Sequence, residues 1–160
     1  MRIEKTKILT RINKLKTTAA VIASAVCFLS SCTDDTVYFS YHPVDNERWE
    51  KSDDIKFSIV PSRYSGKCES FVVLRTNDRY PFKNLSVSVE TIIRDTVFTK
   101  RVDFEVGRKT NSSFRHNDLV MPVSQFSVNE NDTLHIRIAH NMKQNVLQGI
   151  TDVGVKITKH

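Results

Sequence analysis

Residues 85–90 read Leu-Ser-Val-Ser-Val-Glu, a strict alternation of apolar and polar side chains. Successive side chains of a β-strand point to opposite faces, so this period of two places the apolar residues on one face of a sheet. Similar alternation, or a short run that is apolar on both faces, recurs in seven other segments: 37–41, 55–59, 70–74, 102–106, 123–128, 134–138 and 153–157. The sequence therefore predicts eight short strands and no long helix.

Eight such segments are typical of two antiparallel sheets packed face to face. We predict one all-β domain over residues 37–160, an antiparallel β-sandwich of jelly-roll type. Arg94-Asp95 is expected at a hairpin tip, Gly107–Asp118 in a long surface loop, and His140–Ile150 to hold one helical turn. The residues expected inside the sandwich are Leu74, Val87, Val89, Val102, Phe104, Ile136, Ile138, Val155 and Ile157.

The N-terminal segment has the features of an export signal. Residues 1–16 carry six basic groups and one acid, and residues 17–31 are uncharged with an apolar centre that is too short to span a bilayer stably. The segment ends in Leu29-Ser30-Ser31-Cys32, which resembles the lipobox of bacterial lipoproteins. We predict a signal peptide over 1–31, a lipidated Cys32 and a short tether over 32–36; an uncleaved anchor or an ordinary secretory signal is the alternative.

Lipidation attaches the protein to a membrane of the cell envelope, and the outer membrane is favoured over the inner one. Thr33-Asp34-Asp35 resembles an acidic surface-export signal, although the same residues also suit a solvated tether. The sequence therefore leaves open whether the domain faces the periplasm or the cell surface.

The formal charge of +6 comes almost entirely from the leader. Without residues 1–31 the counts are 24 − 6 = 18 basic and 18 − 1 = 17 acidic groups, a net charge of about +1. A nearly neutral domain has no electrostatic footprint for nucleic acid. Once Cys27 leaves with the leader and Cys32 is acylated, Cys68 has no partner for a disulfide and is expected to be an idle or buried thiol.

No motif for catalysis, phosphate binding or a metal appears, so we expect a non-enzymatic protein without a cofactor. His135 and His140 are five residues apart and point to opposite faces of a strand, where surface positions are expected. A hydrolase would require converging carboxylates, or a histidine in contact with Cys68. A second alternative is glycan binding by exposed aromatic residues, although most of these are expected to fill the core: Tyr38, Phe39, Tyr41, Trp49, Tyr80 and Phe82.

Three stretches together resemble the gliding-motility lipoprotein family GldH of Bacteroidetes. They are 48–57, RWEKSDDIKF; 75–85, RTNDRYPFKNL; and 140–155, HNMKQNVLQGITDVGV. The chain departs from the family pattern at Gly107–Phe114. The positions that carry the resemblance are Trp49, Asn77, Asp78, Tyr80, Pro81, Asn84, Met142, Leu147, Gly149, Asp152 and Gly154.

The resemblance implies an envelope lipoprotein associated with gliding motility and type IX secretion, which acts by scaffolding or by binding other envelope proteins. Several motif residues look structural first: Asn77 and Pro81 suit a turn, Gly149 a chain reversal, and Gly154 a bulge or a close backbone approach. Three Asp-Thr-apolar triplets resemble an O-glycosylation sequon of exported proteins in that phylum. They place candidate glycans on Thr36, Thr96 and Thr133, of which Thr36 is expected to be the most accessible.

Overall fold

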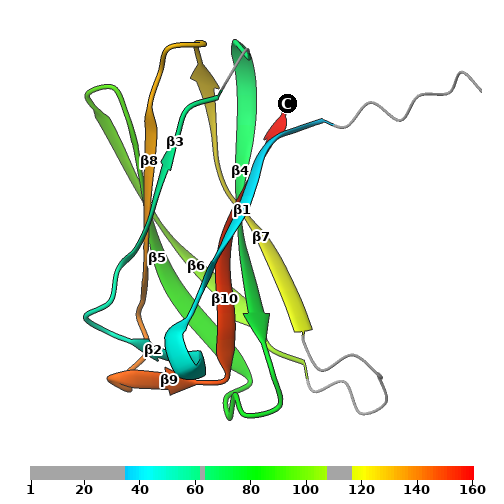
Figure 1. Ribbon diagram of the computed structural model, residues 1–160, viewed down its shortest axis with the longest axis vertical. Coiled ribbons are helices and arrows are strands. Elements are labelled where there is room, and N and C mark those ends of the chain that lie inside the picture. Colours follow the sequence, from blue (N-terminus) through cyan, green and yellow to red (C-terminus); the bar gives the residue numbers. More distant parts are fainter. Residues whose placement is uncertain (1–34, 62–63, 108–116) are drawn as a thin grey trace, which may run out of the picture. The chain divides into compact units, whose positions relative to one another are not determined.

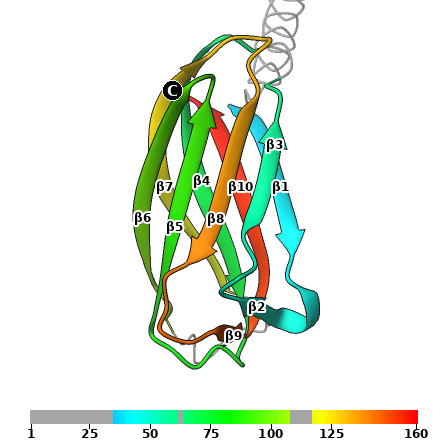
Figure 2. The same cartoon turned by 90° about the vertical axis from the view of Figure 1, so that its left-hand side faces the viewer.

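A computed structural model describes residues 35–61, 64–107 and 117–160. Two four-stranded antiparallel sheets face each other (Figures 1 and 2). The strand order of the first sheet is β1-β10-β4-β7, with β1 Thr36–Pro43, β10 Ile150–Lys159, β4 Gly66–Thr76 and β7 Asn117–Val128. The strand order of the second is β3-β8-β5-β6, with β3 Ile55–Ile59, β8 Leu134–His140, β5 Asn84–Ile93 and β6 Thr96–Glu105.

The order of the strands identifies the topology. When these eight long strands are counted along the chain, the two sheets read 1-8-3-6 and 2-7-4-5. Sequential strands thus alternate between the sheets, except for the hairpin of β5 and β6 within the second sheet. This is the pattern of a double Greek key, which defines a jelly roll. The predicted fold class is confirmed. Each of the eight segments with strand character lies in one of these strands, apart from Val106, which follows the end of β6.

A third, two-stranded sheet was not predicted. It pairs β2, Arg48–Glu50, with β9, Val146–Gln148, and a short 3₁₀ segment, η2 Asp45–Glu47, precedes β2. Three residues are too few to show an alternation, so the sequence gives no periodic signal for either strand.

The core lies between the two large sheets, as the alternation requires. All nine residues predicted to lie inside are buried. Cys68 is also buried, on the inner face of β4, and burial raises the pKa of its thiol. The hairpin tip at Arg94-Asp95 is confirmed, because Ile93 pairs with Thr96 and Arg94 has a φ of 53°.

Two expectations for the C-terminal half are wrong. Residues 140–150 contain no helical turn: β8 continues to His140, and residues 146–148 extend along β2 instead. His140 is not a surface residue but is 2% exposed, whereas His135 is exposed and does lie on the opposite face.

Some expectations fall on parts of the chain that lie outside the described residues. These parts include the leader, Cys32 and positions 108–116 of the expected loop Gly107–Asp118, whose last two residues already belong to β7. At the other boundary, β1 begins at Thr36, the last residue assigned to the tether. Within the described part of the chain, no helix is long and apolar enough to cross a membrane.

Candidate functional site

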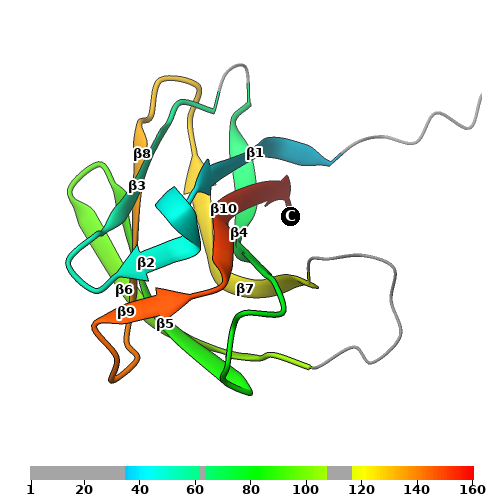
Figure 3. The same cartoon turned by 60° about the horizontal axis from the view of Figure 1, so that its bottom comes forward.

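The three motifs, which are far apart in the sequence, meet at one end of the sandwich. This end, called the motif end below, consists of η2, β2, β9, the β4–β5 turn (77–83) and loop 141–145. Trp49 of β2 pairs with Leu147 of β9, and the amide of Asn77 donates to the carbonyl of Gly149 (2.9 Å). Figure 3 shows β2 and β9 lying across this end, with β9 leading into β10. Each motif is therefore joined to another through its backbone.

Glu47 connects these segments through its side chain. Its Oε2 accepts a hydrogen bond from Nδ2 of Asn77 (2.6 Å) and forms an ion pair with Arg79. The Asn77 side-chain oxygen accepts the amide of Arg79 (3.0 Å), and the Asn77 carbonyl accepts the amide of Tyr80 (3.1 Å). The predicted turn chemistry of Asn77 is thus present. Sequence reasoning missed Glu47 and Arg79, because their contact bridges 32 positions and leaves no local pattern.

Gly149 is the point of closest approach between the segments. Its φ is 82°, and a Cβ at this position would lie 2.3 Å from the amide nitrogen of Tyr80 and 2.7 Å from the carbonyl carbon of Arg79. Its own amide donates to the carbonyl of Glu47 (2.9 Å). The left-handed φ and the contact with backbone both require glycine here.

Trp49 fills the interior behind the β2–β9 sheet. Its side chain is fully buried, and its Nε1 donates to the carbonyl of Asp53 (2.9 Å). The ring of His140 packs edge-on against the indole, with centroids 5.3 Å apart. Burial lowers the pKa of His140, and the nearby charge of Lys51 lowers it further; a weak contact with the Trp49 backbone only partly offsets these effects. His140 is therefore a neutral core residue at pH 7.

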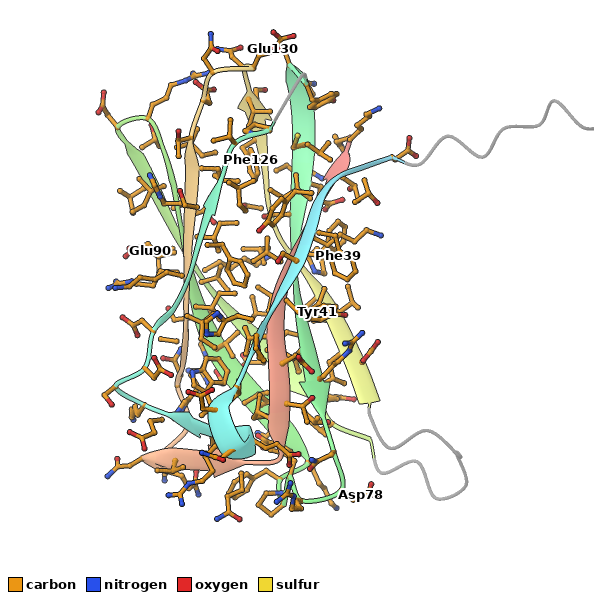
Figure 4. The ribbon with its side chains drawn as sticks, in the orientation of Figure 1. Phe39, Tyr41, Asp78, Glu90, Phe126 and Glu130 are labelled. Carbon is orange, nitrogen blue, oxygen red and sulfur yellow. The ribbon has the colours of Figure 1, made fainter. Side chains whose placement is uncertain are left out.

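Tyr80 and Asn84 hold the other side of the β4–β5 turn. The Tyr80 hydroxyl donates to the carbonyl of Asn84 (2.8 Å), and burial raises the pKa of Tyr80. Phe82 packs edge-on against the Tyr80 ring at 5.6 Å. Asp78 and Pro81 are exposed on the outside of the same turn, and Figure 4 shows Asp78 at the tip of this end.

The last two motif residues lie elsewhere, on the outer face of the first sheet. Gly154 leaves room for the ring of Tyr41, whose Cδ1 would be 2.7 Å from a Cβ at this position. The predicted close approach at Gly154 is therefore present. The guanidinium of Arg75 lies 4.0 Å from the centroid of the same ring, and Asp152 is close enough to interact electrostatically with both.

The aromatic residues considered for glycan stacking do not form a flat platform. Trp49 and Tyr80 are buried, while Phe39 is 50% exposed beside the half-buried Tyr41 (Figure 4). The Phe39 and Tyr41 rings are 4.9 Å apart at an interplanar angle of 62°. An edge-to-face pair presents no continuous plane to a sugar ring.

Two carboxylates converge on the outer face of the second sheet. Asp54 and Glu90 both bond to the guanidinium of Arg137, at 3.4 and 3.0 Å. The two carboxylates pair with the same guanidinium, as in a surface ion-pair network. In the described residues, no group of three or more His, Cys, Asp or Glu is placed to hold a metal ion.

The motif end also carries an open hollow of about 330 Å³. It lies between the start of β5, the end of β6 and loop 141–145. Its lining consists of Phe82, Asn84, Ser86, Arg101, Asn141, Met142, Lys143 and Gln144. Two of the motif residues, Asn84 and Met142, belong to this lining. The hollow itself was not predicted.

The candidate glycosylation sites are distributed differently from the expectation. Thr96 and Thr133 are exposed, at the start of β6 and just before β8, whereas Thr36 is only half-exposed at the start of β1. Thr36 is therefore not the most accessible of the three, because pairing of β1 with β10 covers it.

The fold and the motif end define a class of protein: a jelly-roll domain in which three separate motifs build one end of the sandwich. The family model of the GldH lipoproteins matches residues 36–157, and the chain belongs to this family of gliding-motility-associated, lipid-anchored envelope proteins. No curated protein sequence matches the chain.

Two solved structures show a weak likeness. One is Eiger TNF from S. frugiperda, with 11% identity, a TM-score of 0.35, and coverage of 61% of this chain and 60% of that one. The other is dimeric latent PorU from Porphyromonas gingivalis, with 9% identity, a TM-score of 0.35, and coverage of 81% of this chain and 14% of that one. The chain thus spans less than two thirds of either structure.

Proposed function

We propose that this protein is acylated at Cys32 and acts without enzymatic chemistry, as a scaffold that binds another envelope protein through its motif end. In this role it would serve gliding motility or the associated type IX secretion. The outer membrane is the favoured location. Nucleic acid is not among the proposed partners, because the domain without its leader is nearly neutral.

The observation that carries the proposal is the position of the motif end. β1 starts beside Asp35 at one end of the sandwich and runs toward η2 at the other (Figure 1). The 11 residues of β4 span about 35 Å at ~3.3 Å per residue. Cys32 is three residues from Asp35, a reach of at most about 11 Å. Lipidation at Cys32 would therefore hold the opposite end near the membrane and leave the motif end free for a partner.

The internal contacts of the polar groups at the motif end support a non-enzymatic role. Glu47 is engaged by Asn77 and Arg79, and His140 is buried behind Trp49. These groups hold the chain segments together and do not face a common open space. Glycan binding by a pair of stacked aromatic rings remains a weaker alternative, because Phe39 and Tyr41 are not coplanar.

Cross-linking in the native host tests the proposal. Full-length tagged protein with Asp78→Lys, at the motif end, is compared with Asp95→Lys, an equal charge change at an exposed hairpin tip of the opposite end. We expect Asp78→Lys to reduce capture of a specific envelope protein and Asp95→Lys to leave the capture unchanged. Equal capture by both variants, or loss only with Asp95→Lys, would contradict the assignment of the motif end.

A further inference from the structure

The hollow at the motif end combines a fixed frame with free polar side chains. The Asn141 amide donates to the Ser86 carbonyl (2.8 Å), Lys51 Nζ donates to the Met142 carbonyl (2.9 Å), and the Lys51 amide donates to the Asn145 carbonyl (2.7 Å). Loop 141–145 is thus held by three hydrogen bonds to the body of the domain. A loop that is already ordered before a ligand binds lowers the conformational-entropy cost of binding.

The side chains on this frame are not used by the fold. Within the described residues, the side-chain carboxamides of Asn84, Asn141 and Gln144 make no hydrogen bond, and neither does the ammonium of Lys143. By contrast, the Asn77 side chain makes two hydrogen bonds in the neighbouring turn. Three carboxamides, each a donor and an acceptor, therefore surround one hollow with their bonding capacity open.

The charge of the hollow is positive. Arg101 and Lys143 line it, and no lining residue is acidic. Arg101 bonds through Nε to Asp103 (3.2 Å), which leaves its terminal nitrogens available. The nearby Ser86 hydroxyl and the Arg101 guanidinium lower the pKa of Asp103, so this neighbouring carboxylate stays ionised and offsets part of the charge.

The hollow also has an apolar wall, made by Phe82 and Met142. The Phe82 ring is held in place by its edge-on contact with Tyr80, which is itself bonded to the Asn84 carbonyl. A sugar ring offers C–H groups on its faces and hydroxyl groups at its rim. An apolar wall next to carboxamides matches both, and the volume of about 330 Å³ lies at the lower end of the range for small-molecule sites.

We infer that this hollow binds an anionic saccharide, with the sugar ring against Phe82, its hydroxyl groups on Asn84, Asn141 and Gln144, and its acidic group on Arg101 and Lys143. The inference goes beyond the scaffold role and does not depend on lipidation or on a protein partner. A peptide is a poorer match, because strand addition or a helix groove needs a row of pockets, and this is a single hollow.

Binding by the full-length lipoprotein in detergent tests the inference. The probes are trigalacturonate, which is acidic through carboxylates, glucose 6-phosphate, which is acidic through a phosphate, and neutral maltotriose; triglutamate represents an acidic peptide. Isothermal titration calorimetry measures the binding of each probe to the wild type, Lys143→Ala and Asn141→Ala proteins. The matched controls are Lys56→Ala and Asn131→Ala, which remove exposed side chains of the same types outside the hollow.

We expect at least one acidic sugar to bind more tightly than maltotriose. Lys143→Ala and Asn141→Ala should each weaken its binding by about 3- to 10-fold, the effect of one hydrogen bond, and the controls should have no effect. Tighter binding of trigalacturonate would indicate recognition of a carboxylate, and tighter binding of glucose 6-phosphate would indicate recognition of a phosphate. Binding of none of the sugars, equal binding of maltotriose, binding unaffected by the two variants, or tighter binding of triglutamate would each overturn the inference. All four substitutions are on exposed side chains, so unaltered urea unfolding verifies the fold.

Discussion

Replacing Gly149 by alanine is expected to destabilise the domain strongly. A non-glycine residue at a φ of 82° costs about 1–2 kcal/mol. The new Cβ would also lie 2.3 Å from the Tyr80 nitrogen, so the two backbones have to move apart. That movement breaks the bonds from the Gly149 amide to Glu47 and from the Asn77 amide to Gly149, at about 0.5–1.5 kcal/mol each. The sum is a loss of roughly 2–5 kcal/mol in the free energy of unfolding.

Urea unfolding of the wild-type and Gly149→Ala proteins, followed by tryptophan fluorescence, measures this loss. With an m value of about 1.5–2 kcal/mol/M, the midpoint should fall by roughly 1–3 M. The control is Gly107→Ala, because Gly107 is exposed and has no atom within 4 Å of an added Cβ. It should stay within about 0.5 kcal/mol of the wild type. If the midpoints of the two variants coincide, the close approach at Gly149 does not limit stability and the reasoning is refuted.

Three further predictions concern the anchor, the pH response and modification. Cys32→Ala should abolish incorporation of labelled palmitate in the native host; continued labelling would exclude Cys32 as the acylated residue. Because burial lowers the folded-state pKa of His140 below 6.5, the unfolded chain takes up the proton first. Stability should therefore be constant above about pH 6.5 and fall below it, and a pH series of urea midpoints should be flatter for His140→Gln. If the chain is O-glycosylated, peptide mass spectrometry should find the glycan on Thr96 or Thr133 rather than on Thr36, and an intact mass of peptide plus lipid alone would rule out all three sites.

The large sheets were predictable because each long strand carries its own alternation. The alternation of residues 85–90 fixes which side chains point inward and excludes registers that are shifted by one residue. The register of β5 with β6 also depends on their hairpin turn. The strands β2 and β9 lack such a signal. Their pairing depends on Trp49 and Leu147, which are 98 positions apart and become neighbours only after the sandwich has closed.

The site was predictable in its backbone chemistry and not in its side-chain contacts. Asparagine favours turns and glycine favours a left-handed φ, and the structure shows a turn at Asn77 and a left-handed φ at Gly149. Glu47 looks like any surface acid in the sequence, and its role follows only from the meeting of η2 with the β4–β5 turn. His140 was misjudged for a similar reason, because β2 and its Trp49 cover a strand end that would otherwise face solvent.

Two kinds of residue therefore divide the work at the motif end. Internal contacts occupy Gly149, Asn77 and Trp49, which fix the course of the backbone. These residues are therefore not available to bind a ligand. Recognition has to reside in side chains that the frame presents but does not use, such as Asn141 and Lys143. It follows that frame and surface are separable by mutation. Gly149→Ala should weaken binding together with stability, whereas Lys143→Ala should weaken binding by about 3- to 10-fold at full stability. A binding defect that always accompanies unfolding would show that the motif end has no recognition surface of its own.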